Sequence, residues 1–124
     1  MDGKKRFVLL DFDGVIADSY AITRAVSMIA CAHITDEMHK KAFEANVHES
    51  YEKLLKEPHG PKCDHRLNWE EEYMPRFRKS GRLFPGIAES IHDLAQEYQL
   101  FIVSSATTGM IREILEKHDL AGYF

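Results

Sequence analysis

The sequence predicts an α/β fold in which a parallel-sheet core is interrupted by a helical insertion. Two apolar runs, residues 7–10 (FVLL) and 100–103 (LFIV), are short and wholly apolar, as is typical of parallel strands that are covered on both faces. Each run leads directly into polar residues, and ligands bind such sheets at the carboxyl ends of the strands. Between the two runs, the apolar residues follow helical spacing. The candidate chemistry therefore lies just after residues 10 and 103.

The first strand is expected to end in two carboxylates, Asp11 and Asp13, within the segment DFDGVIADS. Alternate strand residues share a face, so both side chains should project into one crevice, although Gly14 indicates that the backbone leaves the extended conformation there. Neighbouring carboxylates repel unless a cation neutralises them, and hard oxygen ligands favour Mg²⁺. We therefore expect Mg²⁺ as the cofactor, with Asp11 and Asp13 as its metal ligands. The alternative is a simple turn, where Asp and Gly are common.

This segment resembles the first motif of the haloacid dehalogenase-like (HAD) hydrolase superfamily, an apolar strand followed by DxDG, an apolar pair and often DS. The resemblance implies a Rossmann-like core with a helical cap and phosphatase chemistry on a small phosphorylated metabolite. It makes Asp11 the nucleophile that forms an aspartyl phosphate, with Mg²⁺ bridging Asp11 and the phosphate. Asp13 would protonate the leaving alcohol and then activate water, and its backbone carbonyl would help to hold the metal.

The second apolar run leads into residues 104–109 (SSATTG), which resemble the second motif of the superfamily. The resemblance implies that the Ser104 hydroxyl binds the transferring phosphoryl group. Backbone N–H groups around Ser105 could supply further donors. A helix that opens at Thr108 would add a favourable potential for an anion. The alternative is an ordinary Ser/Thr helix cap.

The residues between the two strands are expected to form helices. A first helix should carry an apolar stripe made by Ile22, Val26, Ile29 and Ala30, and a second stripe is made by Phe43, Val47, Tyr51, Leu54 and Leu55. A loop is expected at residues 58–61. Asn68 should then cap a helix that Pro75 kinks or ends. After residues 84–86 (FPG), an amphipathic helix returns the chain to the second strand, with apolar positions Ile87, Ile91, Leu94, Ala95 and Tyr98.

The domain organisation follows from the segment LFPGI, residues 83–87, which resembles the usual return from a cap inserted after the first motif. Residues 17–82 are therefore expected to form the helical cap. Residues 1–16 and 83–124 would form the discontinuous, partial Rossmann-like core. A cap of this kind closes over the carboxylates and presents side chains to the leaving group.

Composition is typical of a soluble domain, since 29% of the residues are charged and 44% are hydrophobic. The net charge of −4 gives no electrostatic footprint for nucleic acid. No apolar run approaches membrane-spanning length and the N-terminus does not resemble a signal sequence, so we expect no membrane partner and a cytoplasmic location. The two cysteines, Cys31 and Cys63, favour reduced thiols over a disulfide framework.

The family's active site also requires a lysine and an acidic residue or pair downstream of the second strand, which this chain does not reach. Two apolar strands alone would also leave hydrophobic faces and open edges poorly covered. We therefore expect an N-terminal portion whose partner is the missing C-terminal half of the core, with weak or no activity by itself.

Other functions stay open. A non-catalytic interaction module or pseudoenzyme fragment would keep the fold without turnover, and a phosphomutase would use the same DxD pair. Residues 106–113 (ATTGMIRE) also resemble the second motif of phosphonoacetaldehyde hydrolases, but the first motif of those enzymes lacks the second aspartate that Asp13 supplies. A sugar-nucleotide transferase would need a nucleotide-binding unit before its DxD, where only ten residues stand.

Overall fold

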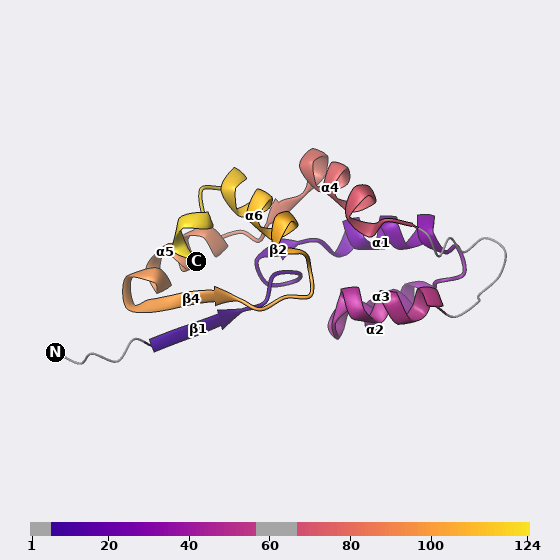
Figure 1. Cartoon of the computed structure of the whole chain (residues 1–124), viewed down its shortest axis with the longest axis horizontal. Helices are drawn as coiled ribbons and strands as arrows, with labels where there is room; N and C mark the ends of the chain where they lie inside the picture. The colour runs from indigo at the N-terminus through magenta and orange to yellow at the C-terminus, as the bar shows by residue number, and fades with distance from the viewer. Residues whose placement is uncertain (1–5, 57–66) are drawn as a thin grey trace. The chain divides into compact units, whose positions relative to one another are not determined.

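The computed structural model describes residues 6–56 and 67–124, which form two compact units (Figure 1). Unit 1 contains the described residues up to Ala17 together with Leu83–Phe124, and unit 2 contains those within Asp18–Arg82. The short strands β2 (Ala17–Asp18) and β3 (Arg82–Leu83), where the chain passes between the units, pair with each other. Each unit is described by itself below.

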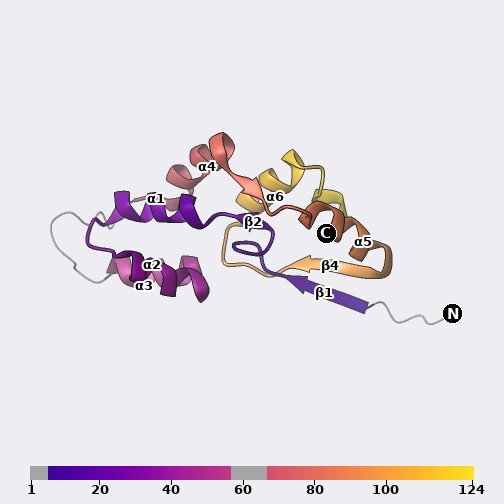
Figure 2. The same cartoon turned by 180° about the vertical axis from the view of Figure 1, so that it is seen from behind.

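Unit 1 is built on a parallel pair of strands, which confirms the predicted α/β class. Strand β1 (Arg6–Leu10) pairs with β4 (Tyr98–Ile102) in a register that runs from Arg6↔Tyr98 to Leu10↔Ile102. Helix α5 (Ile87–Glu97) leads into β4, and α6 (Thr108–Lys117) and the short helix η1 (Ala121–Tyr123) follow it. Figures 1 and 2 show α5 and α6 on the same side of the strand pair. The second strand starts at Tyr98, two residues earlier than its apolar run predicted.

Only one face of this sheet is covered, so the expectation that both strands are buried on both faces is wrong for the described chain. Leu100 is fully buried, whereas Phe7, Leu9 and Val103 are 62%, 65% and 61% exposed. The rings of Phe7 and Phe101 lie 5.7 Å apart on the open face. The expectation that two strands alone would leave an apolar face uncovered is thereby confirmed.

Unit 2 consists of four helices: α1 (Tyr20–Ala30), α2 (Asp36–Glu44), α3 (Val47–Lys56) and α4 (Trp69–Ser80). Thr35 caps the start of helix α2, and its hydroxyl accepts a hydrogen bond from the backbone N–H of Met38. Asn68 caps α4 in the same way, as predicted, by accepting from the N–H of Glu71. Helices α2 and α3 lie side by side in Figure 2.

Helix α4 continues through Pro75 to Ser80, so Pro75 does not end it. Pro75 faces solvent, while the neighbouring side chains of Tyr73, Met74 and Phe77 are buried and hold the opposite side of the helix. The stabilisation from packing these side chains outweighs the cost of the one backbone hydrogen bond that proline removes.

The core of unit 2 gathers side chains from several helices and the loops between them. One cluster consists of Cys31, Ile34, Ala42, Val47 and Tyr51, with Met38, Phe43 and Trp69 packed against it. The predicted stripe of α1 is buried except at Ile29, which is exposed. The side chains of Leu54 and Leu55, the predicted loop at residues 58–61 and Cys63 lie outside the described residues.

Cys31 is disulfide-bonded, so the expectation of reduced thiols is wrong at this residue. Among the described helices, none combines the length and the apolar character that a membrane crossing requires.

Candidate functional site

The two candidate carboxylates lie on a tightly hydrogen-bonded loop that follows β1. Between them, Phe12 is fully buried, and its carbonyl accepts hydrogen bonds from the N–H groups of Ile16 and Ala17, both at 2.9 Å. Gly14 makes this turn with a φ of +79°, a conformation that residues with a side chain rarely adopt. The backbone therefore leaves the extended conformation where the sequence predicted, and Phe12 anchors the loop that carries both acids.

Asp11 and Asp13 have different surroundings. The Asp11 side chain is exposed, and its Oδ1 accepts a hydrogen bond of 2.7 Å from the N–H of Phe12. Asp13 is half-buried, and its backbone forms an isolated bridge with Ala17. Asp11 is thus the more exposed of the two acidic residues.

Ser104 follows the neighbouring strand. The ladder between β1 and β4 continues one residue beyond the end of β4, because the N–H of Val103 donates to the carbonyl of Leu10, the last residue of β1, at 2.9 Å. Asp11 and Ser104 therefore follow directly from paired, adjacent ends of two parallel strands. This is the edge of a sheet at which ligands bind.

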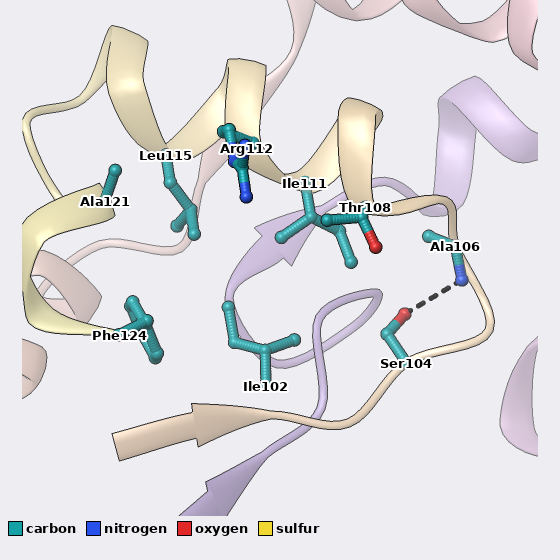
Figure 3. Close-up of a pocket in the computed structure, with 9 residues that line it drawn as sticks. All are labelled: Ile102, Ser104, Ala106, Thr108, Ile111, Arg112, Leu115, Ala121 and Phe124. Atoms are coloured by element: carbon teal, nitrogen blue, oxygen red, sulfur yellow. Dashed lines mark hydrogen bonds between the residues drawn. The ribbon is translucent and has the colours of Figure 1, made fainter. Parts of the chain in front are cut away.

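The Ser104 hydroxyl is half-buried, and its Oγ accepts a hydrogen bond of 3.1 Å from the N–H of Ala106 (Figure 3). Helix α6 is capped by Thr107 instead, whose hydroxyl accepts from the N–H of Met110. The segment therefore does contain an ordinary helix cap, at Thr107, while Ser104 is not that cap and its role as a phosphate ligand stays a prediction. Ser105 is exposed beside it.

A cavity of about 330 Å³ lies next to Ser104, between the end of β4, α6 and the last residues of the chain (Figure 3). Its walls are mainly apolar, with Ile102, Ile111 and Leu115 among them. Thr108 and Arg112 also line it and add a hydroxyl and a guanidinium group. From the sequence, Thr108 was expected only as the start of the helix and Arg112 was not singled out, although their spacing of four places both side chains on one face of that helix.

Asp11 and Asp13 are not among the described residues that line this cavity. The cavity therefore brings Ser104 together with Thr108 and Arg112, and not with the two acids. What links the acids to Ser104 is the pairing of the strands that carry them.

The two acidic side chains after β1, Asp11 and Asp13, are the candidate ligands for a metal ion. Within the described ranges, no group of three or more His, Cys, Asp or Glu side chains is arranged to hold a metal. Mg²⁺ is commonly bound by only one or two carboxylates, with water and substrate phosphate oxygens completing its octahedral shell. Asp11 and Asp13 fit that partial role, and Mg²⁺ binding stays a prediction.

Residues 8–124 match the family model of haloacid dehalogenase-like hydrolases. Among solved structures, a haloacid dehalogenase-like family hydrolase from Streptococcus pneumoniae is 14% identical with a TM-score of 0.73, and the match covers 97% of this chain and 59% of that one. The HAD hydrolase YfnB from Bacillus subtilis, solved with magnesium bound, is 26% identical with a TM-score of 0.60, covering 98% and 63%. A search of curated protein sequences finds no match.

A structure from Thermotoga maritima described as a β-phosphoglucomutase is 21% identical with a TM-score of 0.59, covering 96% of this chain and 58% of that one. The chain thus spans between 58% and 63% of the length of these three structures. The family match confirms the resemblance that the two sequence motifs indicated.

Proposed function

Because the chain belongs to the haloacid dehalogenase-like hydrolase family, we propose that it is the N-terminal portion of a Mg²⁺-dependent phosphomonoester hydrolase acting on a small phosphorylated metabolite. One observation carries the proposal: Asp11, Asp13 and Ser104 follow the paired ends of β1 and β4. A buried anchor at Phe12 holds the acid-bearing loop against that edge of the sheet.

In the proposed reaction, the exposed Asp11 carboxylate attacks phosphorus while the bond to the ester oxygen breaks. Asp13 gives a proton to the departing alcohol, so that a neutral product leaves and Asp11 carries the phosphoryl group. Asp13 then takes a proton from the water that attacks the same phosphorus, which releases inorganic phosphate and regenerates Asp11. Bound Mg²⁺, held by Asp11 and Asp13, would supply charge neutralisation for the phosphate.

Ser104 suits the role of phosphoryl ligand. Its Oγ already accepts a hydrogen bond from Ala106, which fixes the oxygen while leaving the hydroxyl hydrogen to be donated. The phosphoryl oxygens carry negative charge in the transition state. A fixed hydroxyl donor at Ser104 would therefore stabilise that state.

The remaining parts of the parent enzyme are also proposals. Unit 2, which follows the first motif in the chain, would act as the cap that sets substrate choice. The C-terminal half of the core would cover the open sheet face formed by Phe7, Leu9, Phe101 and Val103. A parallel sheet normally carries cover on both faces, which supports this assignment.

The test is a panel of phosphate esters, assayed for released inorganic phosphate with and without Mg²⁺, on the 124-residue chain and on the protein extended by whatever follows Phe124. We expect Mg²⁺-dependent release that Asp11→Asn abolishes. Asp93→Asn is the matched control, because Asp93 is an exposed acid on α5 of the same unit. Activity that survives Asp11→Asn, or no turnover in the extended protein, would contradict the proposal.

The same assay separates the alternatives. A phosphomutase would convert its substrate into an isomer that keeps its phosphate, so no inorganic phosphate would appear. A non-catalytic interaction module would turn over no ester even with the rest of the core present. Both outcomes would leave the fold assignment intact.

A further inference from the structure

A buried histidine connects three helices of unit 2. His39, on α2, is fully buried, and its Nδ1 shares a hydrogen bond with the hydroxyl of Tyr51 on α3. Its Nε2 lies 3.3 Å from the backbone carbonyl oxygen of Tyr20 and 3.4 Å from Oγ1 of Thr23, both on α1. Both ring nitrogens therefore have partners, and each partner belongs to a different helix from His39.

These partners can satisfy both nitrogens of the neutral ring when its hydrogen is on Nε2. A carbonyl oxygen can only accept, so the Nε2 that faces Tyr20 must carry the hydrogen. In the neutral ring Nδ1 is then the acceptor, and the Tyr51 hydroxyl donates to it. A second proton on Nδ1 would have to reverse this hydrogen bond inside a packed core.

The charged and titratable neighbours do not offset the cost of a buried imidazolium. Burial, the largest influence, lowers the pKa of His39, and the Arg24 guanidinium lowers it further, while the Tyr20 carbonyl and the Asp36 carboxylate raise it. Arg24 and Asp36 pair with each other at 2.8 Å and act on the pKa of His39 in opposite directions. Burial also raises the pKa of Tyr51, which therefore stays neutral and contributes no negative charge.

We propose that His39 is a built-in pH sensor of unit 2: its neutral ring ties α1, α2 and α3 together, and protonation loosens them. An unfolded chain takes up this proton near the ordinary histidine value of about 6.5. The folded unit takes it up only at lower pH, so unfolding becomes favoured as the pH falls from about 6.5 through the folded pKa. This inference does not depend on the proposed enzymatic function.

The chain carries its own reporter for this event. Trp69 is the only tryptophan, and its ring centroid lies 4.9 Å from that of Tyr51. Trp69 also packs against the core cluster that contains Tyr51. Its fluorescence should therefore follow the integrity of the three-helix contact.

The experiment is denaturant unfolding of the full chain, followed by Trp69 fluorescence at several pH values between about 7.5 and 5. In the wild type, we expect the denaturant concentration at the unfolding midpoint to decrease as the pH is lowered below about 6.5. In His39→Gln this decrease should be smaller. His92→Gln is the matched control, because His92 forms the same kind of bond to a tyrosine hydroxyl, Tyr123 at 2.9 Å, but is exposed and lies in unit 1. A His39→Gln midpoint that falls as steeply as the wild-type midpoint would overturn the proposal.

A second measurement decides the matter if His39→Gln does not fold. NMR titration of the histidine ring protons in the wild type should show His39 protonating at a lower pH than a histidine in an unfolded peptide. A wild-type His39 that titrates at or above the unfolded value would refute the proposed sensor.

Discussion

Replacing Gly81 with alanine should destabilise unit 2 through a single steric conflict. Gly81 caps α4, and a Cβ built at this position would lie 2.4, 2.5 and 2.6 Å from three atoms of the Phe77 ring. These distances are about 1 Å shorter than carbon atoms tolerate in contact. The backbone of Gly81, with φ −70° and ψ 148°, suits alanine, so the conflict comes from the added methyl group alone.

The Phe77 ring has little room to yield. Phe77 is buried, and its ring stacks on Tyr73 with the centroids 5.7 Å apart. Overpacking of this kind costs about 1–3 kcal/mol. Alanine also restricts the unfolded chain, which returns about 0.4–1 kcal/mol, so the net loss should be roughly 1–2 kcal/mol.

The assay is denaturant unfolding monitored through Trp69, which lies on the same helix as Phe77. Gly122→Ala is the control, because a Cβ at position 122 would meet no atom within 4 Å apart from its chain neighbours and its own helix backbone, so the change should stay within about 0.5 kcal/mol. A Gly81→Ala protein as stable as the wild type would refute the close approach of Gly81 to Phe77, and with it the packing of the end of α4.

Three further predictions concern the candidate site and the sheet. In the active protein, Ser104→Ala should lower kcat/KM by roughly 10- to 100-fold, because it removes a fixed donor to a charged phosphoryl group. Ser105→Ala keeps the backbone N–H and should change kcat/KM far less. Steady-state kinetics of both variants test this difference. Leu100→Ala should cost about 2–5 kcal/mol in unfolding free energy, and Leu9→Ala on the open sheet face much less, as denaturant unfolding of each would reveal. A chelator should stop ester hydrolysis and added Mg²⁺ should restore it, and activity that persists in the chelator would count against metal dependence.

Local sequence signals predicted several elements because short-range chemistry determines them. Gly14 predicted the turn that follows β1, and its positive φ confirms that reason. Asn68 predicted the start of α4 because its side chain reaches the N–H of Glu71 without help from the rest of the fold. The start of β4 at Tyr98 was missed because a residue that ends an amphipathic helix and one that begins a strand can share the same apolar character.

Features that depend on distant residues could not be predicted in this way. The strands were predicted to be buried on both faces because a uniformly apolar run does not indicate which neighbours cover it. In the described chain, only one face is covered. His39 offers no local signal, since its partners Tyr20 and Tyr51 lie 19 and 12 residues away. Ser104 and Arg112 line the same cavity, and this likewise depends on how α6 packs against the end of β4.

How precisely the groups of the candidate site are positioned depends on the two-stranded sheet, one face of which is open. The acid-bearing loop is held by buried Phe12 and by the hydrogen bond from Val103 to Leu10. Val103, whose side chain is exposed, makes this hydrogen bond itself, and exposed Leu9 precedes Leu10 in the chain. Any partner that covers the open face would therefore stiffen both strand ends together. Because catalysis requires groups to be fixed within a fraction of an ångström, that cover should hold the loops carrying Asp11, Asp13 and Ser104 in place, in addition to any catalytic groups that it brings.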